Sequence, residues 1–373
     1  MNCEIEFMPV GDGSRAGDAI VVRYGDVSAY DLMIVDGGTI DSGKLLVEHV
    51  QQNFGLNAVI SQVVVTHADA DHASGIREVL EALPVRNLWI HMPWASAQAS
   101  RPYFSDKRWT DDGLTNALIK EYDLIADIVR TASAKQVTLN CPFAGSRIGP
   151  FTVLSPTQRM YELLLPQFDR TPDPDQAALE AAGWWIGKPP MRNVASAFLE
   201  RTTAKIHKWF TESWASERLK DGGQTSASNE SSVVLYGDFS PGGRVLLTGD
   251  AGVVGLTLAA DYAQQLRLPL QQFTFVQVPH HGSRRNVGPT ILNRLLGPIQ
   301  QEGTDPRYAA FVSAPKDDAT HPRQMVLNAF MRRGAKVVAT QGSKKVHWGG
   351  FPARAGYSTA ALMPFVSRVE DYD

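Results

Sequence analysis

The stretch VVVTHADADHASGI, residues 63–76, places two imidazoles and two carboxylates within six positions, directly after a run of β-branched residues. A valine-rich run of this kind is typical of a buried strand. No ordinary turn requires four metal-ligating side chains at this spacing, and burying them costs free energy unless a cation compensates. The pattern therefore predicts a metal-binding strand end. Its four ligand-type residues are His67, Asp69, Asp71 and His72.

Three further polar groups follow predicted hydrophobic strands. Asp36 comes after LMIV, Asp250 after RVLLTG, and the pair His280 and His281 after FTFVQVP. Because strand ends in an α/β sheet open onto one crevice, we expect these side chains to converge. Each piece alone also fits an ordinary turn or a capped loop. Their joint occurrence favours a crevice that holds one or two divalent cations.

Composition sets broad limits on the function. The chain has 373 residues, 43% of them hydrophobic and 20% charged, which is typical of soluble globular proteins. A net charge of −3 excludes a global basic field, although a local basic groove is compatible with it. Cys3 and Cys141 form no CxxC pair, so neither a disulfide framework nor a thiolate zinc site is expected. The N-terminus lacks signal-peptide features and no apolar run spans a membrane, so we expect a cytoplasmic protein.

The chain alternates predicted strands and helices in its first and last thirds, which indicates a layered α/β architecture. Residues 94–228 differ, because helical and irregular segments interrupt the alternation there. Helical spacing predicts helices over residues 115–133 and 193–220. Between them, the proline-rich and acidic segment 169–190 predicts a surface excursion.

The motifs together resemble a known family. THADADHASG resembles the HxHxDH signature of the metallo-β-lactamase fold, with Asp69 in place of the commoner second histidine. Together with GDGSRAGDAIVVRYG, VDGG, LTGDA and PHHGS, it is similar to the subgroup typified by the hydrolase domain of the DNA-uptake protein ComEC. The resemblance runs to about Lys345 outside the helical excursions. It implies a four-layer αβ/βα sandwich, one domain over residues 1–373 with the insertions of 94–228 inside it.

The resemblance implies a dinuclear metal site at the edges of the two sheets. His67 and Asp69 would hold the first ion, and Asp71 and His72 would hold the second. Asp250 would bridge both ions, and a hydroxide between them would complete the site. Two ions of this kind lower the pKa of water and neutralise charge on the scissile group.

Two assignments within this site stay open. His281 would assist the second ion, or His280 if the register is shifted by one, while Asp36 would orient the ligand loop through hydrogen bonds. Family members usually supply a further histidine about twenty residues before the bridging aspartate, and this chain has Asn229 there, with Glu230 beside it. Such an oxygen-rich first site favours manganese or magnesium over zinc. Alternatively, it binds weakly and fills only with substrate.

The substrate expected from a dinuclear site and this resemblance is a phosphodiester, in nucleic acid or a nucleotide. Ser283, Arg284 and Arg285 follow the histidine pair and offer donors for a phosphate, or they form a solvated loop. His321, in DDATHPRQ, would protonate the leaving group or bind phosphate, or it only begins a helix.

Other interpretations remain open at this stage. The same scaffold could cleave a lactam, lactone or thioester, or serve as a non-catalytic binding module. The helical region 94–228 could bind a partner protein. Four tryptophans could stack nucleic-acid bases or fill the core: Trp184, Trp185, Trp209 and Trp214. Four further histidines are interpreted as structural or surface residues: His49, His91, His207 and His347.

Overall fold

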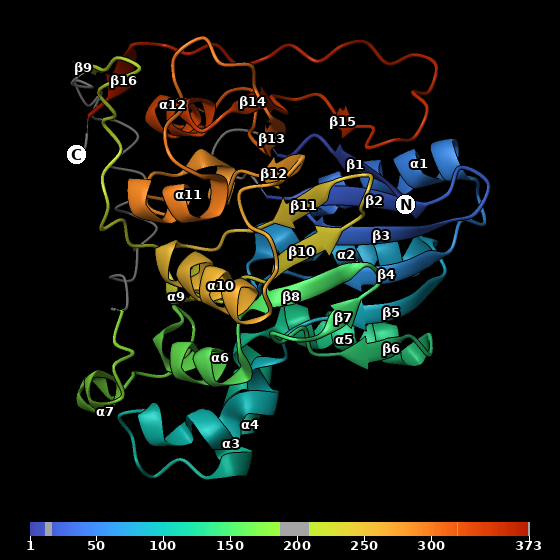
Figure 1. The fold of residues 1–373 in the computed structure, drawn as a ribbon. Helices are drawn as coiled ribbons and strands as arrows, with labels where there is room; N and C mark the ends of the chain where they lie inside the picture. The colour runs from blue at the N-terminus through green and yellow to red at the C-terminus, as the bar shows by residue number, and fades with distance from the viewer. Residues whose placement is uncertain (12–16, 187–208, 319, 372–373) are drawn as a thin grey trace.

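The chain folds around two facing β-sheets of seven strands each in a computed structural model that describes residues 1–11, 17–186, 209–318 and 320–371 (Figure 1). The first sheet comes mainly from the N-terminal third and is closed at one edge by a strand from near the C-terminus. In spatial order its strands are β15 (Lys345–His347), β1 (Asn2–Phe7), β2 (Ala19–Gly25), β3 (Tyr30–Gly37), β4 (Ile60–Val64), β5 (Val85–Trp89) and β6 (Thr138–Asn140).

The second sheet comes from the later part of the chain. Its strands, in spatial order, are β14 (Ala335–Ala339), β13 (Tyr308–Val312), β12 (Phe275–Gln277), β11 (Arg244–Leu247), β10 (Val234–Asp238), β8 (Phe151–Ser155) and β7 (Arg147–Ile148). In each sheet one half is antiparallel and the other is parallel: β3 to β6 run parallel in the first, and β11 to β14 in the second. Parallel neighbours end at the same edge, which brings the loops after β3, β4, β11 and β12 together.

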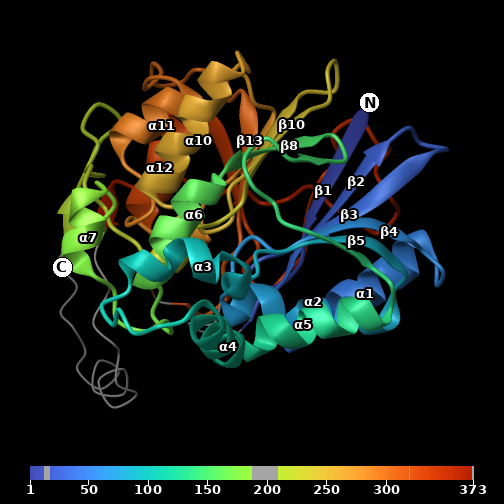
Figure 2. The same cartoon turned by 90° about the horizontal axis from the view of Figure 1, so that it is seen from below.

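Helices cover the outer face of each sheet, and Figure 2 shows the resulting layers. The first sheet packs against α1 (Ile40–Phe54), α2 (Ala70–Ala82) and α5 (Asp123–Ala134), and the second against α10 (Val253–Gln265), α11 (Pro289–Leu296) and α12 (Gln324–Arg332). The predicted four-layer αβ/βα sandwich is confirmed. No helix in the described ranges has the length and apolarity needed to cross a bilayer.

Strand β4 shows why these strands are apolar on both faces. Val63 packs into the core beneath α1 and α2, whereas its neighbour Val64 packs into the core between the two sheets. Successive side chains of a strand point to opposite faces, so a strand covered on both sides is apolar throughout. The polar residues that follow β4 therefore mark the point where the chain leaves the core.

The region 94–228 carries short helices and also strands β6 to β8 of the main sheets. Its helices include α3 (Ala97–Ser100), α4 (Asp111–Glu121), α6 (Gln158–Leu164), α7 (Gln176–Ala181) and α9 (Ala227–Glu230). The helix predicted over 115–133 is wrong as one element: it is α4 followed by α5, because Tyr122 between them has non-helical dihedral angles (φ −107°, ψ 45°).

The helix predicted over 193–220 is also wrong where the structure describes it. Residues 209–211 form β9 (Trp209–Thr211), which pairs antiparallel with β16 (Arg368–Glu370) from the far end of the chain. The remainder of that prediction, with His207, lies outside the described residues. Non-local strand pairing overrides the local helical spacing here.

Candidate metal centre

The carboxylate of Asp250, in the loop after β11, lies at the centre of the candidate site. Four imidazole Nε2 atoms from two other loops surround its Oδ2 atom. Their distances from Oδ2 are 3.4 Å for His72, 3.8 Å for His280, 3.8 Å for His281 and 3.9 Å for His67. The predicted convergence of strand ends therefore brings together ligand-type residues from both sheets.

Each of these four imidazoles is fixed through its other nitrogen. An Nδ1 atom bonded to a protein oxygen sets the ring's orientation and tautomer and leaves Nε2 for a metal ion. The four Nδ1 contacts are His72 to Asp36 Oδ2 at 2.8 Å, His67 to Thr66 Oγ1 at 3.0 Å, His280 to Asn286 Oδ1 at 3.0 Å and His281 to the Ser313 carbonyl at 3.2 Å.

Several atoms that face the centre have no hydrogen-bond partner among the residues that the structure describes. They are His67 Nε2, His72 Nε2, His281 Nε2 and Asp250 Oδ1, and all four are buried. A buried polar atom without a partner costs free energy, so clusters of them are rare in native proteins. Imidazole nitrogens and carboxylate oxygens are ligands for divalent metal ions. The donor set present here therefore fits such ions.

Two aspartates extend the centre in different directions. Asp69 Oδ2 lies 3.6 Å from His67 Nε2, and its Oδ1 accepts a hydrogen bond from Ser228 at 2.7 Å. Asp71 instead groups with His72 and His281, whose ligand atoms lie within 4.8 Å of one another. Three groups of ligand-type residues overlap at His72: it lies with His67 and Asp250, with Asp71 and His281, and with Asp18 and Asp36.

The imidazoles of the centre differ in their affinity for a proton. Burial lowers the pKa of His281 to about 3, so this ring is neutral at pH 7, the form that binds metal. Burial alone would lower the pKa of His72, but Asp250 and Asp36 raise it well above its ordinary value. A proton and a metal ion compete for the Nε2 of such a ring, because both need its lone pair.

The backbone at the centre adopts unusual conformations. Asp36, His280 and His281 all have positive φ values, of 57°, 45° and 53°. Non-glycine residues rarely adopt this left-handed region, and such strain concentrates at functional sites. Gly17 also allows a close approach: a Cβ there would lie 1.7 Å from the carbonyl oxygen of Asp71. The tight packing of these loops holds the candidate ligand residues in place.

Asp18 is a residue of the centre that sequence reasoning missed. It is 2% exposed, accepts a hydrogen bond from Gln277 Nε2 at 2.7 Å and lies 4.0 Å from His72 Nδ1. Its other oxygen accepts a bond from the Ser313 hydroxyl. Burial raises the pKa of Asp18 to about 7. The sequence shows only an aspartate directly before the apolar strand AIVV. It does not show that Asp18 contacts residues of the second sheet, because those partners lie far along the chain.

Asn229 stands where the family resemblance implied a histidine, and the structure places it beside an imidazole. Its Nδ2 lies 2.9 Å from His280 Nδ1 and donates to Thr225 Oγ1 at 2.8 Å. The neighbouring Glu230 turns away, and its carboxylate accepts the Gly255 amide at 2.7 Å at the start of α10. Asn229 therefore contacts a ring at the centre, while Glu230 caps a helix.

In the loop after the histidine pair, Ser283 and Arg284 make hydrogen bonds within the protein. Ser283 is 5% exposed, and its hydroxyl accepts the amide of Arg285 at 3.2 Å. The Arg284 guanidinium donates to the carbonyl of Asp371. Arg285 is exposed. Of the three predicted phosphate donors, Arg285 has the side chain that is open to solvent.

His321 lies at the rim of the centre. Its ring is nearly parallel to that of His280, with 6.3 Å between ring centroids and 8° between planes. Its Nδ1 lies 3.4 Å from the Asp318 carboxylate. It precedes α12, as a helix-start residue would, but it also faces the metal centre.

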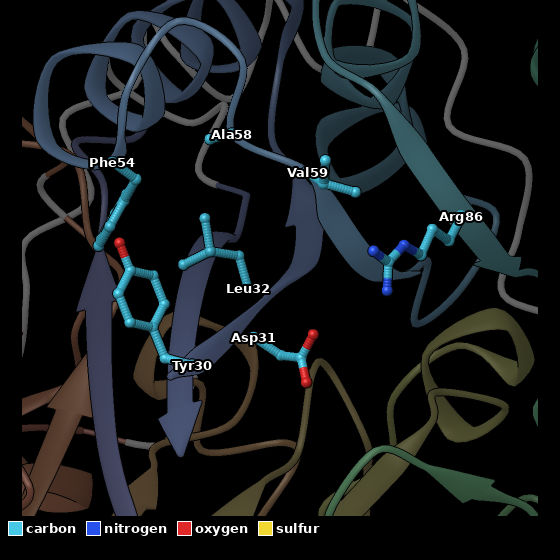
Figure 3. A pocket seen from close by; sticks show the side chains of 7 residues that line it. All are labelled: Tyr30, Asp31, Leu32, Phe54, Ala58, Val59 and Arg86. Carbon is cyan, nitrogen blue, oxygen red and sulfur yellow. The ribbon is translucent and has the colours of Figure 1, made fainter. Parts of the chain in front are cut away.

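The remaining candidates lie apart from the centre. Trp184 packs against the core beneath the first sheet, and Trp214 donates to the Gln300 carbonyl at 2.7 Å, so these two are structural. A pocket of about 270 Å³ opens at the amino-terminal ends of β3 to β5, lined by Tyr30 and Arg86 among others (Figure 3). The metal centre lies at the carboxyl ends of these strands, so this pocket is not part of it.

A family model matches the N-terminal part of the chain. Residues 14–146 match the Metallo-beta-lactamase superfamily. The matched segment contains Asp36 and the whole His67 to His72 cluster. The superfamily consists mostly of hydrolases and typically binds divalent metal ions, often zinc, which supports a metal-dependent hydrolase. The ComEC-like subgroup is not distinguished by this match.

Solved structures are similar to this chain at low identity. A structure described as a metallo-beta-lactamase from Thermotoga maritima is 12% identical, with 67% of this chain and 79% of that chain covered and a TM-score of 0.30. A metallo-beta-lactamase from Hirschia baltica is 11% identical, with coverage of 76% and 87% and a TM-score of 0.29. The long form of RNase Z from yeast is 10% identical, with coverage of 93% and 41% and a TM-score of 0.37. No curated protein matches the chain.

Proposed function

We propose that this protein is a metal-dependent phosphodiesterase of the ComEC-like subgroup, a nuclease that acts at a dinuclear centre. The observation that carries the proposal is the ring of four imidazole Nε2 atoms within 3.9 Å of Asp250 Oδ2. A pair of divalent ions suits a phosphodiester because the ions stabilise both the attacking and the leaving oxygen.

Both members of the histidine pair act as ligands in this proposal. His280 and His281 lie at the same 3.8 Å from Asp250 Oδ2, and each is anchored through Nδ1. His280 would supply the imidazole that Asn229 cannot supply. The first ion would be held by His67, Asp69 and His280, the second by Asp71, His72 and His281, with Asp250 shared between them.

This ligand set changes the expected metal. A first site with one imidazole favoured manganese or magnesium, whereas two imidazoles also suit zinc. We therefore propose zinc or manganese, with about two ions per chain. Metal analysis of the purified protein, followed by stripping and reloading with each ion, identifies which one supports turnover.

Residues at the rim would handle the substrate. Bound divalent ions would lower the pKa of a water molecule and neutralise charge on the phosphate. The Thr320 hydroxyl contacts His321 Nδ1 at 2.9 Å, with the Asp318 carboxylate 3.4 Å from the same atom, which would leave Nε2 to protonate the leaving oxygen. The exposed guanidinium of Arg285 is available to a phosphate oxygen.

A substrate panel tests this proposal. Single-stranded DNA, duplex DNA, RNA, cyclic dinucleotides, bis-(p-nitrophenyl) phosphate and a chromogenic β-lactam are each incubated with the zinc-loaded and the manganese-loaded protein. We expect hydrolysis of bis-(p-nitrophenyl) phosphate and of at least one natural phosphodiester. Turnover of the lactam alone would place the protein among the lactam, lactone or thioester hydrolases. Metal binding without any turnover would indicate a binding module.

A further inference from the structure

We propose that Asp18 is a positioning residue that joins the two halves of the candidate metal centre, because its carboxylate holds the loops that carry Asp250 and His281. The ligand-type residues come from loops after strands of both sheets, so their relative positions depend on contacts between the sheets. This inference rests on the proposed function and adds a role for a carboxylate that is not one of the proposed ligands.

The carboxylate of Asp18 accepts hydrogen bonds from two strand ends of the second sheet. Asp18 directly precedes β2 in the first sheet, whereas Gln277 ends β12 and Ser313 follows β13 in the second (Figure 1). Gln277 Nε2 donates to Asp18 Oδ2 at 2.7 Å, and the Ser313 hydroxyl donates to Oδ1. All three side chains are buried. A carboxylate suits this place because it accepts at both oxygens and has no hydrogen to donate.

The side-chain amide of Gln277 continues the connection to the Asp250 loop. Its Oε1 atom accepts the backbone amides of Thr248 at 2.9 Å and of Gly249 at 3.1 Å, directly before Asp250. Because backbone amides only donate, Oε1 must face them and Nε2 must face Asp18. A displacement of Gln277 would therefore move the loop that carries Asp250.

Ser313 continues the connection to His281. The Ser313 carbonyl oxygen contacts His281 Nδ1 at 3.2 Å, while the hydroxyl of the same residue bonds Asp18. His281 has a φ of 53°, a backbone conformation that persists only where the surroundings hold it. One residue of the second sheet thus links the imidazole to the carboxylate of the first.

Asp18 approaches His72 from the side of the ring that does not face Asp250. Its Oδ2 lies 4.0 Å from His72 Nδ1, the nitrogen that contacts Asp36, whereas His72 Nε2 lies 3.4 Å from Asp250. Both oxygens of Asp18 already accept bonds from the second sheet. The residue therefore acts on the proposed ligands and not as one of them.

A second carboxylate in place of Gln277 tests the connection. Stripped protein is titrated with cobalt(II) at about pH 8, where isolated carboxylates are ionised, and the visible absorption of the bound ion depends on its ligands and their geometry. Gln277→Glu keeps an acceptor for the two backbone amides but sets a carboxylate against Asp18. We expect cobalt to bind about tenfold more weakly, with an altered spectrum, because the two carboxylates repel.

Exchanging donor and acceptor between the two positions should restore the centre. Asp18→Asn alone sets an N–H group against one of two donors and should weaken cobalt binding about tenfold. In Asp18→Asn/Gln277→Glu the introduced amide donates to the introduced carboxylate and still accepts from Ser313. This double variant should bind cobalt within about threefold of the wild type, with the wild-type spectrum.

The matched control is Ser61→Ala, which removes a buried hydroxyl that donates to the Leu32 carbonyl at 2.8 Å. Ser61 lies near the amino-terminal end of β4, and the metal centre lies beyond the other end. The control should lower stability in denaturant unfolding and leave cobalt affinity and spectrum unchanged. If Gln277→Glu fails to fold, Asp18→Asn is compared with the double variant instead.

The outcomes separate the inference from the proposed function. If Asp18 acted only through its charge, the added carboxylate of Gln277→Glu would strengthen cobalt binding. Unchanged or stronger binding in that variant, or no recovery in the double variant, would overturn the inference. The expected pattern in a protein that hydrolyses no phosphodiester would support the inference and refute the proposed function. A wild type that binds no cobalt would overturn both.

Discussion

Two regions of this molecule bury histidine in opposite ways. At the candidate metal centre, His72 and His281 are anchored through Nδ1 to a protein oxygen, and their Nε2 atoms face the Asp250 carboxylate. At the end of β5, His91 is equally buried at 4% exposed, but its ring stacks on Tyr161 with centroids 4.5 Å apart. Neither of its ring nitrogens has a hydrogen-bond partner among the described residues. Burial alone therefore does not make a histidine a ligand.

The difference lies in what surrounds each ring. Oxygen atoms on both sides fix the orientation of a ligand imidazole and raise its affinity for a cation. Around His91 the neighbours are the aromatic rings of Tyr161 and Phe143, and burial lowers its pKa to about 3. That ring is neutral and acts as an apolar packing residue. The predictions below test whether this contrast holds.

The largest effect is expected from Asp250→Asn, which removes the negative charge between the four imidazoles. Hydrolysis should fall by at least about a thousandfold, because charge stabilisation at the centre depends on the bound ions. Phosphodiester turnover and metal content measure this. Asp238→Asn, an exposed carboxylate at the end of β10, is the matched control and should leave both unchanged. Activity within tenfold of the wild type would contradict the assignment.

His280→Ala and His281→Ala should each lower metal affinity by more than about 100-fold if both rings are ligands. Titration of stripped protein with zinc or manganese measures the affinity. A loss in only one of the two variants would identify a single ligand. His91→Ala serves as the control, and it should leave metal affinity unchanged because that ring has no carboxylate beside it.

Asp36→Asn and Asp18→Asn test the two carboxylates that lie near Nδ1 of His72, a candidate ligand. Asp36 holds His72 Nδ1 at 2.8 Å, and Asp18 lies 4.0 Å from the same atom. Losing such a partner typically costs 10- to 100-fold in metal affinity or activity. We expect the larger loss from Asp36→Asn, because its contact is shorter. Full metal affinity in both variants would show that the ring needs no carboxylate partner.

The smallest effect is a change in the pH dependence of stability in His91→Phe. The pKa of His91 is about 3 in the folded protein and about 6.5 when unfolded, so the folded protein loses stability as the pH falls below 6.5. Between pH 6.5 and 4.5 this loss amounts to about 2 kcal/mol, and Phe abolishes it. Denaturant unfolding at several pH values measures the difference. Parallel pH profiles for both proteins would show that His91 is not buried in neutral form.

Much of the centre was predictable because its signals are local. His67, Asp69, Asp71 and His72 lie within six positions, so their clustering is visible in the chain itself. Asp250 and the histidine pair each follow an apolar strand, and parallel strands end at one edge. The alternation of strands with helices predicted a layered α/β architecture, and the family resemblance implied the four-layer sandwich.

Other features depend on contacts between distant segments. Asp18 bonds Gln277, 259 positions away, and β9 pairs with β16 across more than 150 residues. The spacing of neighbouring residues does not show such partners. The described part of the helix predicted over 193–220 therefore contains a strand and a turn instead. The break at Tyr122 likewise interrupts a spacing that looks helical throughout.

The chain by itself determined which residues are of ligand type and that each group would follow a buried strand, because side-chain chemistry and hydrophobic spacing are properties of neighbouring residues. Only the tertiary structure decided that both His280 and His281 face Asp250 and that Asp18 bonds Gln277. Orientation of this kind comes from packing between segments far apart in the chain, where the positions of partners are set by the whole fold.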